Sequence, residues 1–123
     1  MKNILSCILI ILFISCKKNN TGGECNITAF PQHHGKPIKG ATVYVKFGAQ
    51  DLPADPTNNY NLKITALPDE DHANIKSLRY GKYYLYSVGF DSSIMLPVMG
   101  GISLNIKWAE RKKAIDLNIP VTE

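Results

Sequence analysis

Residues 102–108 read Ile-Ser-Leu-Asn-Ile-Lys-Trp, so apolar and polar side chains alternate at every position. Successive side chains of a β-strand point to opposite faces, and this period therefore predicts a strand with one buried and one solvated face. The same alternation recurs at residues 41–47, 62–66 and 115–119. Outside the N-terminal segment, helical spacing covers at most a single turn, within 108–114. The sequence therefore predicts an all-β protein.

The alternating segments 102–108 and 115–119 are expected to form a terminal hairpin that turns through residues 109–113. Further strands are expected at 25–30, 75–78 and 82–90. Clusters of glycine, proline, asparagine and aspartate separate the segments and predict the turns. About seven short strands in about 100 residues favour a single antiparallel β-sandwich.

The N-terminus is organised as a signal peptide rather than as a folded element. Lys2 gives it a positive start, and every residue of 4–14 except Ser6 is apolar. An apolar helix of that length rises only about 16 Å, roughly half of the hydrocarbon thickness that a spanning helix crosses. We therefore expect residues 1–15 to be a cleaved signal peptide.

Residues 13–16 read Phe-Ile-Ser-Cys, which resembles the lipobox of bacterial lipoproteins. The commonest lipobox carries leucine at the position of Phe13 and alanine or serine at that of Ile14, so this instance is slightly atypical. The resemblance implies that the Cys16 thiol receives a diacylglycerol and that Cys16 becomes the first residue after cleavage. Two or three acyl chains would hold the protein permanently at a membrane, because each buried methylene adds about 0.8 kcal/mol.

The segment after the lipobox predicts a tether and a location. Residues 17–23 contain no apolar residue besides two glycines, so we expect 16–23 to be the lipidated cysteine with a flexible spacer and 24–123 to be the β-sandwich domain. By resemblance to known sorting signals, Lys17 in place of an aspartate favours the outer membrane. The pattern leaves open whether the domain faces the periplasm or the cell surface.

Composition excludes several classes of partner and fold. The chain has 123 residues, of which 45% are hydrophobic, so it is too apolar for a disordered protein and too short for two ordinary domains. A formal net charge of +4 is too small to predict nucleic-acid binding. With Cys7 in the signal peptide and Cys16 lipidated, Cys25 has no partner for an intramolecular disulfide.

Two motifs resemble those of a known fold family. Residues 35–43 read Gly-Lys-Pro-Ile-Lys-Gly-Ala-Thr-Val and residues 78–85 read Leu-Arg-Tyr-Gly-Lys-Tyr-Tyr-Leu. They are similar to the strands of transthyretin-like and carboxypeptidase-regulatory-like β-sandwiches, which are accessory modules without catalytic residues. Residues 31–35 together with 42–44 also resemble a group of small uncharacterised envelope lipoproteins. The resemblance therefore implies an immunoglobulin-like or transthyretin-like sandwich with no active site.

The histidines are the most suggestive candidates for a ligand site. His33 and His34 are adjacent, so in a straight strand they would point to opposite faces and would share a metal ion only if the chain bends near Gly35. His72, beside the acidic residues 69–71, would complete a zinc or copper site if the fold brought that loop close. Exposed or structurally hydrogen-bonded histidines are the plainer interpretation, and the sequence alone assigns no metal ligand.

Four tyrosines and an absence of catalytic motifs complete the pattern. Outward members of the cluster formed by Tyr80, Tyr83, Tyr84 and Tyr86 could stack on sugar rings or anchor a protein partner. The sequence contains no nucleophile elbow, zinc-protease helix motif, paired Cys-x-x-Cys or phosphate-binding loop, which indicates no enzyme and no catalytic or cofactor-binding residue.

The sequence therefore predicts a lipid-anchored cell-envelope protein that acts as a non-catalytic binding or interaction module. The one residue to which the sequence assigns a role is Cys16, whose acyl chains would anchor the protein in the membrane. Two alternatives remain open, a periplasmic metal-binding protein that uses His33 and His34, and a surface glycan-binding or adhesion module.

Overall fold

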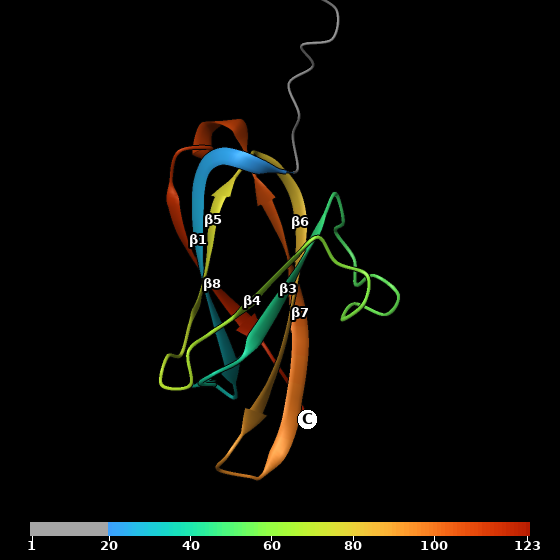
Figure 1. The fold of residues 1–123 in the computed structure, drawn as a ribbon, viewed down its shortest axis with the longest axis vertical. Coiled ribbons are helices and arrows are strands. Elements are labelled where there is room, and N and C mark those ends of the chain that lie inside the picture. The colour runs from blue at the N-terminus through green and yellow to red at the C-terminus, as the bar shows by residue number, and fades with distance from the viewer. Residues whose placement is uncertain (1–19) are drawn as a thin grey trace, which may run out of the picture.

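The computed structural model describes residues 20–123, so the expected signal peptide at 1–15, Cys16 and most of the expected tether lie outside the described residues. The described chain folds into two layers of β-structure (Figure 1). The strands are β1 (Thr21–His33), β2 (Lys36–Pro37), β3 (Thr42–Phe47), β4 (Leu62–Thr65), β5 (Ala73–Leu78), β6 (Gly81–Asp91), β7 (Leu96–Ile106) and β8 (Ala114–Pro120). The expectation of an all-β sandwich is confirmed.

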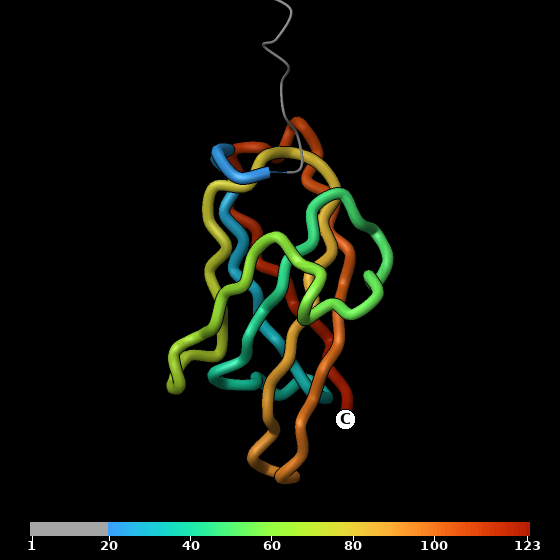
Figure 2. The backbone as a smooth tube through the Cα atoms, turned by 45° about the vertical axis from the view of Figure 1, so that its right-hand side comes forward, coloured from blue at the N-terminus to red at the C-terminus, as the bar shows by residue number. Residues whose placement is uncertain are grey.

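One layer is the antiparallel sheet β4-β3-β6-β7, and the other is built on β1, which pairs with β2, β5 and β8. Helical structure between β7 and β8 is limited to one 3-10 turn, η2 (Trp108–Glu110), as the sequence predicts. The loop at 48–61, drawn in green, extends from one side of the domain (Figure 2). Within residues 20–123, no helix is long and apolar enough to cross a bilayer.

The predicted terminal hairpin is wrong. Strand β7 pairs along its whole length with β6, from Leu96 opposite Asp91 to Ile106 opposite Gly81. Strand β8 lies in the other sheet, parallel to β1, and it is the one parallel partner in the described sheets. Alternation shows which face of a strand is buried but carries no information about its neighbour. Here β8 satisfies the edge of β1 that β5 leaves free, so the chain crosses between the sheets after β7.

The predicted tether is shorter than expected because β1 begins at Thr21 rather than at residue 24. The main-chain N–H of Arg79 donates to the carbonyl of Asn20 at 2.7 Å, and the Tyr83 hydroxyl donates to the carbonyl of Arg79 at 2.6 Å. These bonds fix the start of the domain to the turn between β5 and β6.

The core lies between the two sheets and is filled by alternate residues of the strands. From β1 and β5 it takes Cys25, Ile27, Ala29, Ile75 and Leu78, and from β3 and β6 it takes Val43, Val45, Tyr83 and Leu85. The inward period of β1 continues through Pro31 to His33, and that of β6 continues to Asp91. A histidine and an aspartate therefore occupy the last inward positions of two strands that face each other.

Candidate functional site

The centre of the candidate site is a buried ion pair between the two sheets. His33 is only 4% exposed, and its Nδ1 lies 2.8 Å from Oδ2 of Asp91. The other carboxylate oxygen of Asp91 accepts hydrogen bonds from the main-chain N–H of Ser93 at 2.9 Å and from its hydroxyl at 2.6 Å. A carboxylate bonded in this way stays ionised, so it holds a proton on Nδ1 of His33 and leaves Nε2 as the available ring atom.

The available ring atom of His33 faces a second carboxylate. Oε2 of Glu123 lies 2.5 Å from Nε2, at ion-pair distance, so the ring of His33 lies between the carboxylates of Asp91 and Glu123. The main-chain N–H of Val121 donates to Gln32 at 2.9 Å, and Met99 and Thr122 exchange two main-chain hydrogen bonds. These bonds hold the last residues of the sequence against β1 and β7, so Glu123 is brought to the histidine by backbone pairing.

A bend in the chain brings the second histidine to the first. His34 has a φ of 50° and Gly35 a φ of 76°, which is the left-handed conformation that both central residues of a tight two-residue hairpin turn require. The turn connects β1 to β2, with His33 opposite Lys36. The two imidazole rings lie with their centroids 4.3 Å apart. The chain therefore has the bend that His33 and His34 need in order to bind one metal ion together.

Three side chains of this cluster offer atoms that bind metals. One ligand atom from each of His33, His34 and Glu123 lies within 4.8 Å of the other two, with His34 and Glu123 exposed at the surface. Two imidazole nitrogens and a carboxylate oxygen are ligands that zinc and copper accept. Tetrahedral zinc would hold such atoms about 3.3 Å apart, given bonds of about 2.0–2.1 Å.

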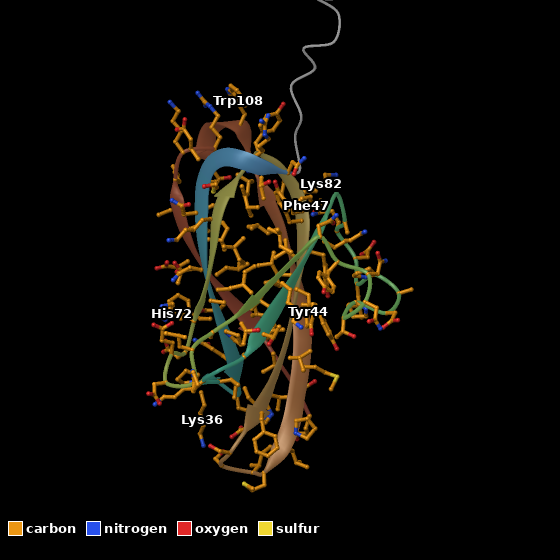
Figure 3. The ribbon with its side chains drawn as sticks, in the orientation of Figure 1. Lys36, Tyr44, Phe47, His72, Lys82 and Trp108 are labelled. Carbon is orange, nitrogen blue, oxygen red and sulfur yellow. The ribbon has the colours of Figure 1, made fainter. Side chains whose placement is uncertain are left out.

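The third sequence candidate, His72, is not part of the cluster. Its Nδ1 lies 3.0 Å from Oδ1 of Asp71, and its ring packs against Phe30 with the centroids 5.7 Å apart, at the side of the domain where Figure 3 labels it. Sequence reasoning named two of the three clustered residues and missed Glu123, Asp91 and Ser93. In β1 every second residue faces the core, and this alternation predicts that the side chain of His33 is buried.

The tyrosines and Cys25, which the sequence also suggested, differ in their exposure. Tyr83 is buried in the core, where burial raises the pKa of its hydroxyl to about 12, whereas Tyr84 and Tyr86 are half-buried on the opposite face of β6. Cys25 is a free thiol in the core, and burial raises its pKa, so it lacks the exposed thiolate that a nucleophile needs. Eight residues of extended chain separate it from His33, about 26 Å.

The ion pair makes stability depend on pH in the metal-free protein. The hydrogen bond to Asp91 raises the pKa of His33 above its usual 6.5, and Ser93 and His33 lower the pKa of Asp91 to about 2. The contribution of His33 is complete below pH 6.5 and is lost as the pH rises through its folded-state pKa. That of Asp91 is present above pH 3.8 and is lost as the pH falls toward 2.

We therefore expect the metal-free protein to melt at its highest temperature between about pH 4 and 6.5 and at lower temperatures as the pH rises past neutrality. Calorimetric melting from pH 3 to 9 measures this profile. A His33→Gln variant should lose the decline above neutrality. A wild-type melting temperature that increases from pH 6 to 8 would contradict the assignment of the ion pair.

The site thus combines a buried histidine of fixed tautomer with two exposed ligand groups. Such an arrangement can bind a cation, and its chemistry does not by itself identify a family. No model of a known protein family matches the chain, and no curated protein matches it either.

Proposed function

We propose that this chain is a lipid-anchored cell-envelope protein whose β-sandwich is a non-catalytic binding module for a divalent transition metal. The metal-binding alternative raised by the sequence thereby becomes the leading function. The observation that carries it is the cluster of His33, His34 and Glu123, in which one ligand atom of each side chain lies within 4.8 Å of the other two.

A metal site is favoured over a purely structural ion pair by the way in which Ser93 bonds Asp91 and Asp91 in turn bonds His33. In metal sites a ligating histidine donates its other ring N–H to a carboxylate, which fixes the tautomer and makes the ligating nitrogen more basic. Asp91 holds that position on His33, and Ser93 in turn holds Asp91. A structural ion pair does not require a second imidazole beside the first, whereas the ring of His34 lies beside that of His33 with the centroids 4.3 Å apart.

The ligand chemistry favours zinc or copper(II) over calcium and magnesium. The last two prefer oxygen atoms alone, whereas imidazole suits zinc and copper. Three protein ligands leave one position of a tetrahedral zinc ion for a water molecule or another donor.

Calorimetric titration of the full-length protein in detergent with zinc tests the proposal. We expect one zinc ion per chain, no heat with magnesium, and affinity that falls as the pH decreases through neutrality, because protons compete for the histidines and the pKa of His33 is raised above its usual 6.5. Asp91→Asn should weaken zinc binding by about 10–100-fold without removing a ligand. The matched control is Asp116→Asn on the exposed face of β8, which should bind as the wild type does.

The membrane location rests on the lipobox at residues 13–16, with Cys16 as the lipidated residue and the outer membrane favoured by Lys17. Kinship with transthyretin-like sandwiches rests on the motifs at 35–43 and 78–85. Gly81, in the second motif, has a φ of 139° in the turn between β5 and β6, the kind of position for which that motif uses glycine.

A glycan-binding role has less support. Tyr84 and Tyr86 lie on the outer face of β6, in register with Lys46 and Tyr44 of β3. The ring of Tyr44 is already in edge contact with Tyr60, at a centroid distance of 5.0 Å, and the ring of Tyr84 lies over the backbone at Gly101. These contacts cover part of the faces on which a sugar would stack.

A further inference from the structure

One end of the domain concentrates exposed aromatic and cationic side chains. Figure 3 shows Trp108 and Lys82 at this end, and Figure 1 shows that β1 begins there. We define the basic-aromatic cap as the residues of three segments, 21–24, 79–82 and 107–113. They come from the start of β1, the turn between β5 and β6, and the crossing from β7 to β8.

The aromatic part of the cap is built around the chain's one tryptophan. Trp108 is 58% exposed, although its side chain is large and apolar. The ring of Tyr80 meets it edge-on with the centroids 4.9 Å apart, and the guanidinium of Arg111 lies 4.0 Å from its ring centroid. The pair borders a shallow hollow whose opposite wall is the backbone of Gly22 and Gly23.

The charge of the molecule is polarised along the same axis. The cap holds six cationic side chains, Arg79, Lys82, Lys107, Arg111, Lys112 and Lys113, and two acidic ones, Glu24 and Glu110, a formal charge of +4. The rest of the described chain holds five cationic and eight acidic residues, a formal charge of −3. The mild overall charge therefore conceals a strongly basic cap on a domain whose remainder is slightly acidic.

The length of the chain before the domain limits how far this end can lie from a membrane. Asn20, the first described residue, is hydrogen-bonded to the cap through Arg79. Four residues of fully extended chain from Cys16 span at most about 14 Å. This step rests on the proposed lipidation of Cys16.

We propose that the basic-aromatic cap docks on anionic lipid headgroups. Tryptophan and tyrosine are enriched at the level of the headgroups, and each lysine or arginine near an anionic surface gains from its potential. Docking of the cap turns the opposite end of the domain away from the bilayer. The cluster of His33, His34 and Glu123 then faces the aqueous phase.

A second exposed apolar group lies at the turn between β6 and β7, where Phe90, Ile94, Met95 and Leu96 are exposed. This turn lies at one end of the domain in Figure 1, and Trp108 is labelled at the other end in Figure 3, which has the same orientation. Residues 90–96 contain no lysine or arginine, and the chain enters the domain at the other end, where Asn20 is hydrogen-bonded to Arg79.

The single tryptophan gives a direct test with the protein as it is purified from the membranes of the cells that express it. The protein is reconstituted into phosphatidylcholine vesicles with or without 30% phosphatidylglycerol, and quenching of Trp108 by lipids brominated near the headgroup is measured. We expect strong quenching with phosphatidylglycerol, at least twofold weaker quenching in its absence, and loss of the difference at high salt.

Charge reversal at the two ends supplies matched variants. Lys112→Glu with Lys113→Glu changes two exposed lysines of the cap, and Lys36→Glu with Lys39→Glu changes two exposed lysines elsewhere. The first pair should reduce quenching to the level of neutral vesicles, whereas the second pair should leave it unchanged. Circular dichroism checks that all variants are folded.

The outcomes separate docking from the anchor itself. Flotation of the protein with the vesicles reports the anchor, and quenching of Trp108 reports the cap. A protein that floats with vesicles but shows equal, weak quenching in both compositions would overturn docking and leave the anchor standing. A protein that does not float would contradict lipidation of Cys16, and docking would fall with it.

Discussion

Replacing Cys16 with alanine is expected to abolish acyl labelling of the protein completely. If residues 13–16 act as the proposed lipobox, the thiol of Cys16 is the group that would carry the diacylglycerol thioether, and cleavage would follow that acylation. The precursor should therefore accumulate with its signal peptide attached, visible as a larger species on gels. Metabolic labelling with radioactive palmitate measures the effect.

The chain offers a matched control for this experiment in Cys7, which lies inside the apolar segment of the signal peptide. Cys7→Ala should be labelled and processed as the wild type is. Retained labelling of Cys16→Ala would show that the lipobox assignment is wrong.

Replacing His34 with alanine is expected to reduce zinc affinity by more than about 100-fold, a larger loss than that of an outer-shell partner. His34 is exposed, so its replacement removes no side chain from the core, and the strain of an alanine at a φ of 50° is confined to the turn between β1 and β2. The variant should therefore keep its fold, so that the loss of binding is not a loss of structure. Calorimetric titration with zinc measures it.

His72→Ala is the matched control, because it removes an imidazole outside the cluster. This control should bind zinc with wild-type affinity. Equal affinity of His34→Ala and the wild type would remove His34 from the site, and loss of binding in His72→Ala would place the metal elsewhere.

The strands themselves were largely predictable from the sequence. A period of two fixes which side chains of β3, β6 and β7 face the core, since only one face of each strand is covered. The partner of each strand was not predictable in the same way. The segment 107–113 is compatible in length with a hairpin, and only the unpaired edge of β1 explains why β8 crosses to the other sheet.

The candidate site was predictable only in part. His33 and His34 stand out because they are adjacent, and the glycine after them allows the bend. Asp91 lies 58 residues from His33, and no local pattern connects the two. Glu123 reaches the histidines through the pairing of Thr122 with Met99, which again depends on strand order. Residues that long-range strand pairing brings to the site cannot be predicted from their spacing in the sequence.

The charge polarity shows a similar limit. The basic residues of 107–113 are visible in the sequence, but their proximity to Arg79, Tyr80 and the start of β1 results from the fold. The total charge of +4 gave no sign of an end with a charge of +4 and a remainder of −3.

X-ray absorption spectroscopy at the zinc edge of the zinc-loaded full-length protein tests metal binding at this cluster most directly. The account predicts nitrogen and oxygen neighbours at about 2.0–2.2 Å, with the outer-shell scattering of two imidazole rings. A sulfur neighbour at about 2.3 Å would place the zinc on a cysteine. That result, or a first shell without imidazole, would contradict a site formed by His33, His34 and Glu123.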